Sequence, residues 1–341
     1  MNKKKVVVFG GGSGLSTILR GLKLFPLDIT AVVSVSDNGG SSGILTKLNQ
    51  IPAIGDLRKV YASMSENKNL ENILNYRFKK EPFKNHPLGN LILLALFEMN
   101  RENLDKSIYD LNQIFKINGR VLPVTSTKVE LCAEYEEGVV VGEESINKHL
   151  GQIINLYTNP KCDVNIEVLK SVEEADLIIL SPGSLYTSTL ASVCYSDLIL
   201  GIKKSKAKKV YISNIMTEPN ETLDFKLSDH INAIKNVLGI DIDIVICNNY
   251  YKFDSLINLE YNRLGSKPVI LDNENINRNI LIYSANLVEI ENAYVRHNAL
   301  KLAMLIFQIL YEEWFKCHLH QIVKTKLRKL KLNKFTVRWQ L

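Results

Sequence analysis

The chain has 341 residues, of which 46% are hydrophobic and 23% are charged. This balance is typical of a globular protein and excludes a disordered, collagen-like or disulfide-scaffold protein. The net charge of +6 comes from one segment, because eight Lys and Arg and no Asp or Glu lie from Trp314 to the end, which leaves 34 basic against 36 acidic residues elsewhere. The residues before Trp314 are therefore nearly neutral in sum, which argues against nucleic-acid binding by this part of the chain.

The sequence also limits the expected location and redox chemistry. The longest apolar run in the first half covers residues 91–97, far short of the roughly 20 residues that span a bilayer. The segment before the first glycines holds too few apolar residues for a signal peptide. We therefore expect a cytoplasmic protein. Its five cysteines form no C-x-x-C pair, so we expect neither a zinc site nor a redox pair.

Elements of an open parallel sheet begin at the N-terminus. Residues 5–9 form a β-branched apolar run that predicts a buried strand. A glycine-rich loop follows at residues 10–14, and apolar residues at helical spacing follow from 15 to 24. Residues 29–35 predict a second buried strand, which ends in another loop of small residues at 36–43. This order is typical of an α/β fold with helices on the faces of a parallel sheet.

The rest of the chain continues this pattern around an insertion. Residues 57–115 are predicted to be mostly helical, with a buried helix at 88–99, and residues 121–141 to be extended, with a hairpin of strands 131–135 and 139–141. The later elements are strands at 176–180, 209–213 and 243–247 and a core helix at 298–312. We therefore expect a single α/β domain over residues 1–312, with an open, mostly parallel sheet and an inserted helical and β-hairpin section.

The first glycine-rich loop is a candidate phosphate-binding turn. In open α/β sheets ligands bind beyond the carboxyl ends of the strands, and glycine lets the backbone approach an anion there. However, Leu15 stands where the dinucleotide fingerprint needs a third glycine, and no G-K-[ST] follows. A nicotinamide-dependent dehydrogenase and a Walker A loop are thus disfavoured. A tight strand-to-helix turn without a ligand stays open as the alternative.

Two further loops strengthen the case for a phosphate or diphosphate ligand. Asp37 lies just past the second strand, where an acid could reach a ribose hydroxyl or Mg²⁺, and five of the next six residues are Gly or Ser. In the third loop, Pro182 fixes a turn, Gly183 opens it, and Ser184 is placed to cap the next helix. Simple turn formation and capping remain the alternative functions of these loops.

The helical section contributes the remaining candidates for catalysis. Asp56 precedes the helix that we expect to start at Leu57, and it could either cap that helix or position a substrate. His86 lies just before the buried helix, with Asn90 one turn on, so both could face a cleft. Asp37, Asp56 and His86 are thus the candidate catalytic residues.

These segments together resemble the gluconeogenesis factor family of the CofD-like superfamily. The resemblance runs in order from about residue 5 to about residue 310. The segments that carry it are VVVFGGGSGLS (6–16), DNGGSSG (37–43), GDLR (55–58), HPLGN (86–90), GRVLPVT (119–125), SPGSLYTS (181–188), NIMTEP (214–219), SDH (228–230) and VRH (295–297).

The resemblance implies a Rossmann-like fold and a function. The superfamily includes 2-phospho-L-lactate transferase, which uses a guanosine-diphosphate-linked substrate with magnesium. Gluconeogenesis factors are linked to growth on gluconeogenic carbon sources and to cell shape, and they bind UDP-sugars, notably UDP-N-acetylglucosamine. We therefore expect a cytoplasmic UDP-sugar-binding regulator, with a magnesium-dependent transferase as the alternative, and no cofactor beyond the nucleotide sugar and Mg²⁺. Related open sheets often dimerise, so a homodimer is an open alternative to a monomer.

The resemblance also places individual residues at the ligand. The first glycine loop and residues 181–187 would hold the diphosphate, and Asp37 and Asn38 would face the ribose, sugar or metal. Many relatives have a second acid at the position of Asn38, and together with Asp37 it would form a two-acid Mg²⁺ site. The amide of Asn38 weakens such a site, which leaves Asp37 as the expected metal ligand. The complete expected ligand set is Gly11, Gly12, Ser13, Gly14, Asp37, Asn38, Gly39, Gly40, Ser41, Ser42, Asn90, Ser181, Gly183, Ser184, Tyr186, Thr187, Asn214, Thr217, Tyr261 and Arg296.

Two of these residues have a structural alternative. Tyr261 could stack on or hydrogen-bond the base or sugar, or it could be a packed surface residue. Arg296 could pair with the diphosphate, or it could form a surface ion pair.

A basic extension over residues 313–341 lies outside the resemblance. Its apolar residues, from Phe315 to Leu330, fall on one helical face with Lys and Arg elsewhere. Such an amphipathic helix could contact an anionic membrane surface or a partner protein. Packing on its own body is the alternative.

Overall fold

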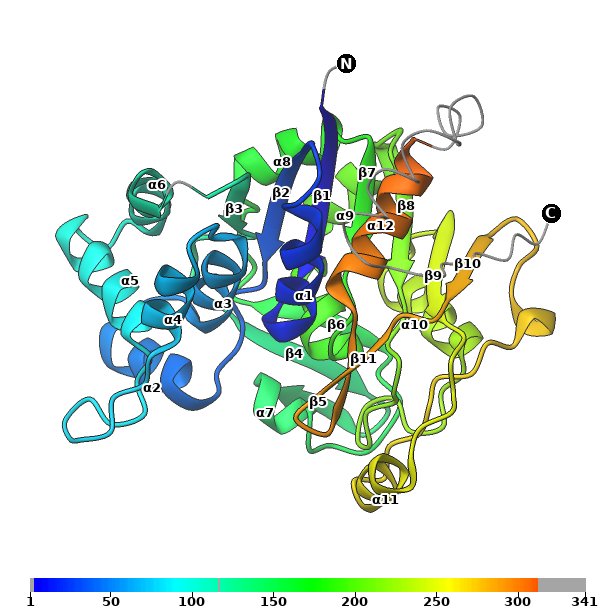
Figure 1. The fold of residues 1–341 in the computed structure, drawn as a ribbon. Helices are drawn as coiled ribbons and strands as arrows, with labels where there is room; N and C mark the ends of the chain where they lie inside the picture. Colours follow the sequence, from blue (N-terminus) through cyan, green and yellow to red (C-terminus); the bar gives the residue numbers. More distant parts are fainter. Residues whose placement is uncertain (1–2, 116, 312–341) are drawn as a thin grey trace.

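A seven-stranded parallel sheet forms the centre of the computed structural model, which describes residues 3–115 and 117–311. The strand order is β10-β9-β8-β7-β1-β2-β3. The chain therefore moves outward in one direction from β1 and in the other direction from β7, so the order reverses between these two strands (Figure 1). The strands are β1 (Lys4–Gly10), β2 (Leu27–Val33), β3 (Arg120–Pro123), β7 (Leu177–Leu180), β8 (Lys208–Ile212), β9 (Ile244–Asn248) and β10 (Leu281–Ala285).

Burial on both faces explains why these strands are continuous apolar runs. In β1, Val6, Val7, Val8 and Phe9 are at most 1% exposed. Val6 pairs with Ile29 of β2 on one side, and with a residue of β7 on the other. Both faces of a parallel sheet are covered by crossover helices, so no polar residue is needed on either face. The predicted strands at 5–9, 29–35, 176–180, 209–213 and 243–247 are all confirmed within a few residues.

Helices cover both faces of the sheet, which confirms the expected α/β class. Figure 1 shows α1 and α12 in front of the strands and α8 and α9 behind them. The helices are α1 (Gly12–Leu22), α2 (Gly40–Asn49), α3 (Gly55–Met64), α4 (Lys68–Asn75), α5 (Leu88–Met99), α6 (Leu104–Phe115), α7 (Glu143–Ile146), α8 (Ile166–Glu173), α9 (Ser196–Lys204), α10 (Leu227–Leu238), α11 (Ser255–Arg263) and α12 (Ala299–Leu310). Short turns of helix add η1 (Leu185–Thr189), η2 (Leu190–Ser192) and η3 (Asn273–Asn275).

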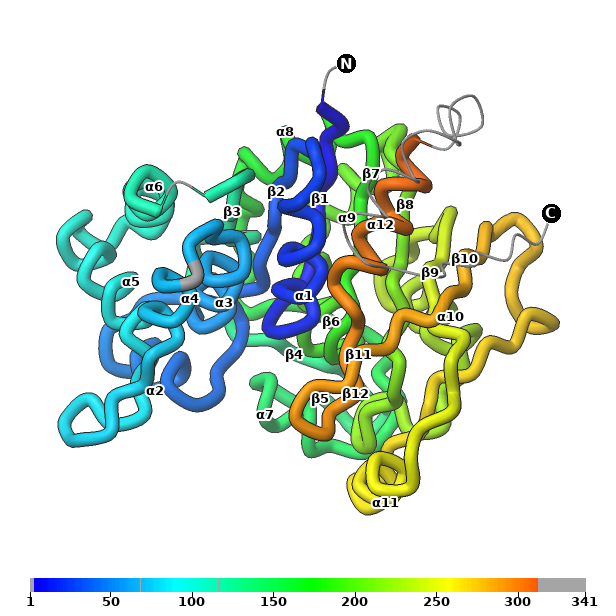
Figure 2. Tube along the Cα trace, in the orientation of Figure 1, coloured from blue at the N-terminus to red at the C-terminus, as the bar shows by residue number. Residues whose placement is uncertain are grey.

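The first and last helices of the described chain pack directly on each other. Figure 2 shows the tube of α12 running beside that of α1. A Cβ added at Gly21 would lie 2.0 Å from the carbonyl oxygen of Ala299, so the two backbones approach as closely as glycine allows. Two helices from opposite ends of the described sequence are thus packed against each other in the fold.

The insertion between β2 and β3 and the antiparallel section after β3 differ from the prediction in detail. α3 to α6 form the expected helical section, and β4 (Glu130–Tyr135) with β5 (Gly138–Val141) form the expected hairpin. Residues 121–123 were predicted to be extended, and they form most of β3 at the edge of the main sheet. β6 (Asn155–Asn159) adds an unpredicted third strand beside β4. A second hairpin, which was not predicted, joins β11 (Val288–Glu291) to β12 (Tyr294–His297).

One hydrophobic cluster includes residues from Val6 to Tyr311 and so extends over the whole described chain. The boundary of the domain at residue 312 stays a prediction, and the basic extension over 313–341 lies outside the described residues. Within residues 3–115 and 117–311, no single helix is long and apolar enough to cross a membrane. One pair, Leu185–Ser192 and Ser196–Lys204, meets the criterion by length and composition only, and it is bent by 70°.

Candidate functional site

A cleft of about 430 Å³ opens at the carboxyl ends of β1, β7 and β8. The loops that follow these three strands form its walls, and α11 and the β11–β12 hairpin complete it. Figure 1 shows α7, α11 and this hairpin gathered at one end of the sheet, below the strands. Because the strand order reverses between β1 and β7, the cleft lies where open α/β sheets bind ligands.

The first glycine loop forms the floor of the cleft. Gly12 adopts a positive φ of 57°, which favours glycine, and α1 begins there without a side-chain cap. A Cβ at Gly14 would lie 1.8 Å from the carbonyl oxygen of Pro182. The loop after β7 therefore rests on the first turn of α1, and only glycine permits this contact. An exposed helix start of this kind favours binding of an anion.

Asp56 attaches α3 to the glycine loop. Its Oδ2 accepts a hydrogen bond of 2.6 Å from the backbone N–H of Gly12, and its Oδ1 lies 2.7 Å from Nζ of Lys59. Of the two alternatives for Asp56, capping of a helix that starts at Leu57 is ruled out, because α3 starts at Gly55 and its N-cap is Ile54. The carboxylate instead holds the loop, and Lys59 brings an unpredicted positive charge into the cleft.

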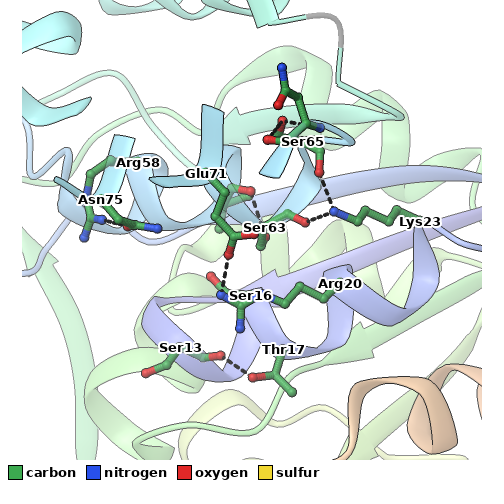
Figure 3. Close-up of polar contacts among 12 residues, drawn as sticks. Ser13, Ser16, Thr17, Arg20, Lys23, Arg58, Ser63, Ser65, Glu71 and Asn75 are labelled. Atoms are coloured by element: carbon green, nitrogen blue, oxygen red, sulfur yellow. Dashed lines mark hydrogen bonds and ion pairs between the residues drawn. The ribbon is translucent and has the colours of Figure 1, made fainter. Parts of the chain in front are cut away.

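α1 is also fixed on the side that faces α3 and α4. Figure 3 shows Arg20 of α1 paired with Glu71 of α4, at 2.8 Å, and Lys23 donating to the carbonyl oxygen of Ser63. Near the start of the helix, the hydroxyl of Thr17 donates to the carbonyl of Ser13. Ser13 and Thr17 both line the cleft, so the anchored helix presents two hydroxyl-bearing residues to it.

Asp37 and Glu143 form a pair of carboxyl groups at the edge of the cleft. Oδ1 of Asp37 accepts a hydrogen bond of 2.8 Å from the N–H of Gly39, and the side chain of Asp37 is hydrogen-bonded to Glu143 of α7. Burial, with the charges of Asp37 and Asp56, raises the pKa of Glu143 to about 9. Burial and the charge of Asp56 also raise the pKa of Asp37. At neutral pH the pair therefore shares a proton, which is held mainly by Glu143.

The loop after β7 is held by Glu221 rather than by its own serine. Ser184 was expected to cap the following helix, and this was wrong because its side chain makes no capping hydrogen bond to η1. Instead, the carboxylate of Glu221 accepts hydrogen bonds from the amides of Leu185, Tyr186 and Thr187, at 2.8, 3.0 and 3.1 Å. It also accepts a bond of 2.6 Å from the Ser184 hydroxyl. These three amides are therefore satisfied within the protein.

Asn214 and Thr217, at the end of β8, fix neighbouring backbone. The side chain of Asn214 donates to the carbonyl of Gly183 at 2.8 Å and accepts from its N–H at 3.2 Å. The hydroxyl of Thr217 accepts from the N–H of Lys267 at 3.0 Å. Both residues line the cleft, so the segments on either side of them form a connected wall.

Tyr261 and Arg296 lie together on the wall made by α11 and β12. Tyr261 is buried against Ile215, Ile257 and Val295, and its hydroxyl accepts a hydrogen bond of 2.8 Å from the N–H of Val295. Arg296 is exposed, and its guanidinium lies 5.2 Å from the ring centre of Tyr294. The ring of Tyr261 therefore packs within the protein and also lines the cleft, while the charge of Arg296 stays accessible to a ligand.

The Tyr261 hydroxyl provides a stability test. In Tyr261→Phe the buried N–H of Val295 loses its acceptor, so we expect the free energy of unfolding to fall by about 1–3 kcal/mol. Urea denaturation measures this change. Tyr109→Phe, at a side chain that is 63% exposed, is the matched control. Equal stability of the two variants would show that the hydrogen bond from the N–H of Val295 to the Tyr261 hydroxyl does not stabilise the fold.

The cleft brings together only part of the predicted set. Ser41, His86 and Asn90 form a separate polar group, in which the Ser41 hydroxyl lies 2.8 Å from Nδ1 of His86 and accepts a bond of 3.2 Å from Asn90. The predicted residues that line the cleft are Gly11, Gly12, Ser13, Gly14, Asp37, Asp56, Gly183, Ser184, Asn214, Thr217, Tyr261 and Arg296. Those outside its lining are Asn38, Gly39, Gly40, Ser41, Ser42, His86, Asn90, Ser181, Tyr186 and Thr187.

The residues outside the cleft have local contacts of their own. Asn38 accepts a hydrogen bond from the N–H of Glu144, and so it orients α7. Ser42 accepts one from the N–H of Gly55. Ser181 is fully buried, and the hydroxyl of Thr187 donates to Asn147 at 3.0 Å. For these residues the structure shows scaffold contacts, and their assignment to a ligand stays a prediction.

Sequence reasoning missed several residues that line the cleft. Among the charged ones are Lys59, Glu143 and Glu218. Lys59 follows the GDLR segment directly and Glu218 lies inside NIMTEP, so their positions within recognised segments were an available signal. Glu143 had no such signal, because it reaches the cleft from the antiparallel insertion.

The fold and the site define a Rossmann-like α/β protein with a cleft at the reversal of its strand order. A family model described as 2-phospho-L-lactate transferase CofD matches residues 6–288. The chain belongs to the CofD family, and within it to the gluconeogenesis factors. The resemblance found in the sequence is thereby confirmed.

Three similar proteins match this chain over nearly their whole length. A relative from Thermotoga maritima is 40% identical over 313 residues, covering 89% of this chain and 99% of its own length. The gluconeogenesis factor of Bacillus subtilis is 38% identical over 315 residues, covering 91% of this chain and 99% of the relative. A crystal structure of a UPF0052 family member from Bacillus halodurans, 37% identical, matches with a TM-score of 0.85, covering 89% of this chain and 99% of the other.

Proposed function

We propose that the protein is a cytoplasmic regulator that binds a nucleotide-diphosphate sugar, with UDP-N-acetylglucosamine as its ligand. In this role it would support growth on gluconeogenic carbon sources and the maintenance of cell shape, as the gluconeogenesis factor family implies. The observation that carries the proposal is the cleft itself, which the start of α1 and Arg296 both line at the switch point of the sheet.

The charges around the cleft support an anionic ligand. Lys59 and Arg296 are the basic residues in its lining, and Asp37, Asp56, Glu143 and Glu218 are the acidic ones. The raised pKa values of Glu143, to about 9, and of Glu218, to about 8, keep both carboxyl groups mainly protonated at neutral pH. Asp56 is paired with Lys59. The negative charge that would repel a diphosphate is therefore much smaller than the residue count indicates.

In the proposed complex, the diphosphate lies at the start of α1 and pairs with Arg296. The backbone of Gly12 to Gly14 supplies a close approach and the positive end of the helix dipole. The ring of Tyr261 offers a surface for the base or sugar, while its hydroxyl stays bound to Val295.

Calorimetric titration of the purified chain with UDP-N-acetylglucosamine tests the proposal. GTP and NAD serve as controls, each with and without Mg²⁺. We expect selective micromolar binding of the UDP-sugar with no consumption of the ligand. No binding at millimolar concentration, or a preference for the guanine nucleotide, would contradict it.

Arg296 should contribute strongly to this affinity. We expect Arg296→Ala to weaken binding of UDP-N-acetylglucosamine at least about tenfold, because a charged hydrogen bond to the diphosphate is lost. Arg263→Ala is the matched control, since Arg263 is exposed at the end of α11 and is not part of the cleft lining. Equal affinities of the two variants would contradict the role of Arg296.

A magnesium-dependent transferase is the alternative function, favoured by the Asp37–Glu143 pair. Within the described residues no group of three His, Cys, Asp or Glu side chains could hold a metal ion. Mg²⁺ is commonly held by one or two carboxylates together with phosphate oxygens and water, and Oε2 of Glu143 is buried without a hydrogen-bond partner in the described chain. Asp37 and Glu143 would therefore fit an ion that displaces their shared proton and neutralises a diphosphate leaving group.

The two functions are separated by turnover. Mg²⁺-dependent loss of the nucleotide sugar that stops with a chelator and in Asp37→Asn would support the transferase. Binding without turnover, unchanged by chelator, would exclude it and favour the regulator.

A further inference from the structure

A second pair of carboxyl groups, Glu218 and Glu221, lies in the loop that follows β8. Glu221 accepts four hydrogen bonds, from the hydroxyl of Ser184 and from the amides of residues 185–187. Three of these partners are backbone amides, which can only donate, and a carboxylate that accepts several donors is favoured in its ionised form. Burial acts in the opposite direction and raises the pKa of Glu221. On the number of its donors we take Glu221 as the ionised member of the pair.

Glu218 is the member that faces the ligand. It lines the cleft, its backbone N–H donates to the hydroxyl of Thr222 at 2.9 Å, and its side chain is hydrogen-bonded to Glu221. Since Glu221 is ionised, the proton between the two carboxyl groups belongs to Glu218. Glu218 thus donates to Glu221 and presents a neutral group to the cleft.

We propose that Glu218 determines the affinity of the cleft for anions: while it holds the proton shared with Glu221, the cleft accepts a diphosphate, and when it loses that proton the diphosphate is repelled. This inference rests on the proposed function and concerns the regulation of the same site. It adds to the proposed function a controlling residue, Glu218, and a controlling condition, the protonation of that residue.

Groups from five segments face this carboxyl pair. Glu221 lies in the same loop, and Arg296 approaches from β12. The pKa values of Tyr211 on β8, Tyr135 on β4 and Tyr186 on η1 are raised by burial and, in addition, by the charge of Glu221. Burial and the charge of Glu221 raise the pKa of Glu218 to about 8, and Arg296 acts in the opposite direction. His297, which also lines the cleft, has its pKa lowered to about 4 by burial and is neutral in this range.

Loss of the proton would act on the ligand in two ways. The new negative charge of Glu218 would repel a diphosphate directly. It would also attract Arg296, the cation that the ligand needs. Both effects have the same sign, so affinity must fall as the pH rises through the pKa of Glu218.

Calorimetric titration with UDP-N-acetylglucosamine at pH 6.5 and pH 8.5, on the full chain and on Glu218→Gln, tests this inference. The Gln amide still donates to Glu221 but does not titrate. We expect the affinity of the unsubstituted protein to be about fourfold lower at pH 8.5 than at pH 6.5, and that of Glu218→Gln to be unchanged. The upper limit is set at pH 8.5 because Glu143, whose pKa is about 9, would lose most of its proton at higher pH and would also change the charge of the cleft.

The outcomes separate the inference from the proposed function. Binding that weakens equally in both proteins, or in neither, would overturn the role of Glu218 and leave the ligand assignment intact. No binding by either protein at any pH would overturn the proposed function and, with it, this inference.

The shared proton has a readout that needs no ligand. The pKa of Glu218 is raised in the folded state above the unfolded value of 4.5, so the folded protein binds more protons between pH 4.5 and about 8. The stability that this proton contributes is fully present below pH 4.5 and is lost as the pH rises to about 8. The stability of the unsubstituted protein relative to Glu218→Gln should fall across this window, and a constant difference would show that Glu218 holds no such proton.

Discussion

Gly14→Ala is expected to lower the free energy of unfolding by about 3 kcal/mol, toward the upper end of the effects of overpacking. The added Cβ would lie 1.8 Å from the carbonyl oxygen of Pro182 and 2.6 Å from its carbonyl carbon. Both are backbone atoms that no rotamer change can remove. Either the start of α1 or the loop after β7 must therefore move, and both form the cleft.

Gly201→Ala is the matched control for this substitution. Gly201 also lies inside a helix, α9, but an added Cβ there would meet only side-chain atoms of Leu169 and Val172, at 3.8 and 3.9 Å. We expect this variant to be stabilised by about 0.5–1 kcal/mol, because alanine favours the helix. Urea denaturation measures both changes. Similar stabilities of the two variants would show that the α1 loop does not pack against Pro182 as described.

Asp56→Ala is expected to have the second largest effect, a loss of about 2 kcal/mol in the free energy of unfolding. It removes a buried acceptor from the N–H of Gly12, and it removes the partner of Lys59, whose side chain is 37% exposed and can be solvated. Asp56→Asn keeps an acceptor for Gly12, so we expect it to recover a large part of the loss. Unfolding in urea measures both variants.

Asp241→Ala supplies the control for an ordinary ion pair. Asp241 lies 2.6 Å from Lys235, but both side chains are more than 60% exposed. Exposed pairs contribute little, so we expect a change within about 0.5 kcal/mol. If Asp56→Ala were as mild as this control, Asp56 could not be the group that holds the glycine loop.

The sheet could be predicted because its signal is local. Val6 to Phe9 are buried on both faces and therefore read as an apolar run. The β11–β12 hairpin had no such signal, since Glu289, Glu291 and Arg296 interrupt it and much of it is exposed. The edge strand β3 was predicted only as extended chain, because its pairing with β2 depends on the tertiary fold and not on its residues alone.

The cleft could be predicted only where it is built from strand ends. Gly12, Asp37, Gly183 and Asn214 each follow a parallel strand, and parallel strands end at the same edge of the sheet. Glu143 lies in α7, which follows β5 of a separate antiparallel sheet, so its contact with Asp37 follows from the tertiary fold alone.

The amides of the loop after β7 show a second limit of sequence reasoning. A Ser-Pro-Gly-Ser turn predicts a local cap by Ser184. The structure satisfies these amides through Glu221, which lies 37 residues from Ser184 in the chain. Local motifs identify donors that need partners, but they do not identify a partner that is distant in sequence.

A crystal structure of the protein with UDP-N-acetylglucosamine tests the central claim most directly, because that claim concerns where the ligand lies. We predict that the diphosphate contacts the backbone of Gly12 to Gly14 and the guanidinium of Arg296, with the base or sugar beside Tyr261. A ligand bound at another surface, with this cleft empty, would contradict the assignment of the site and of the function that depends on it.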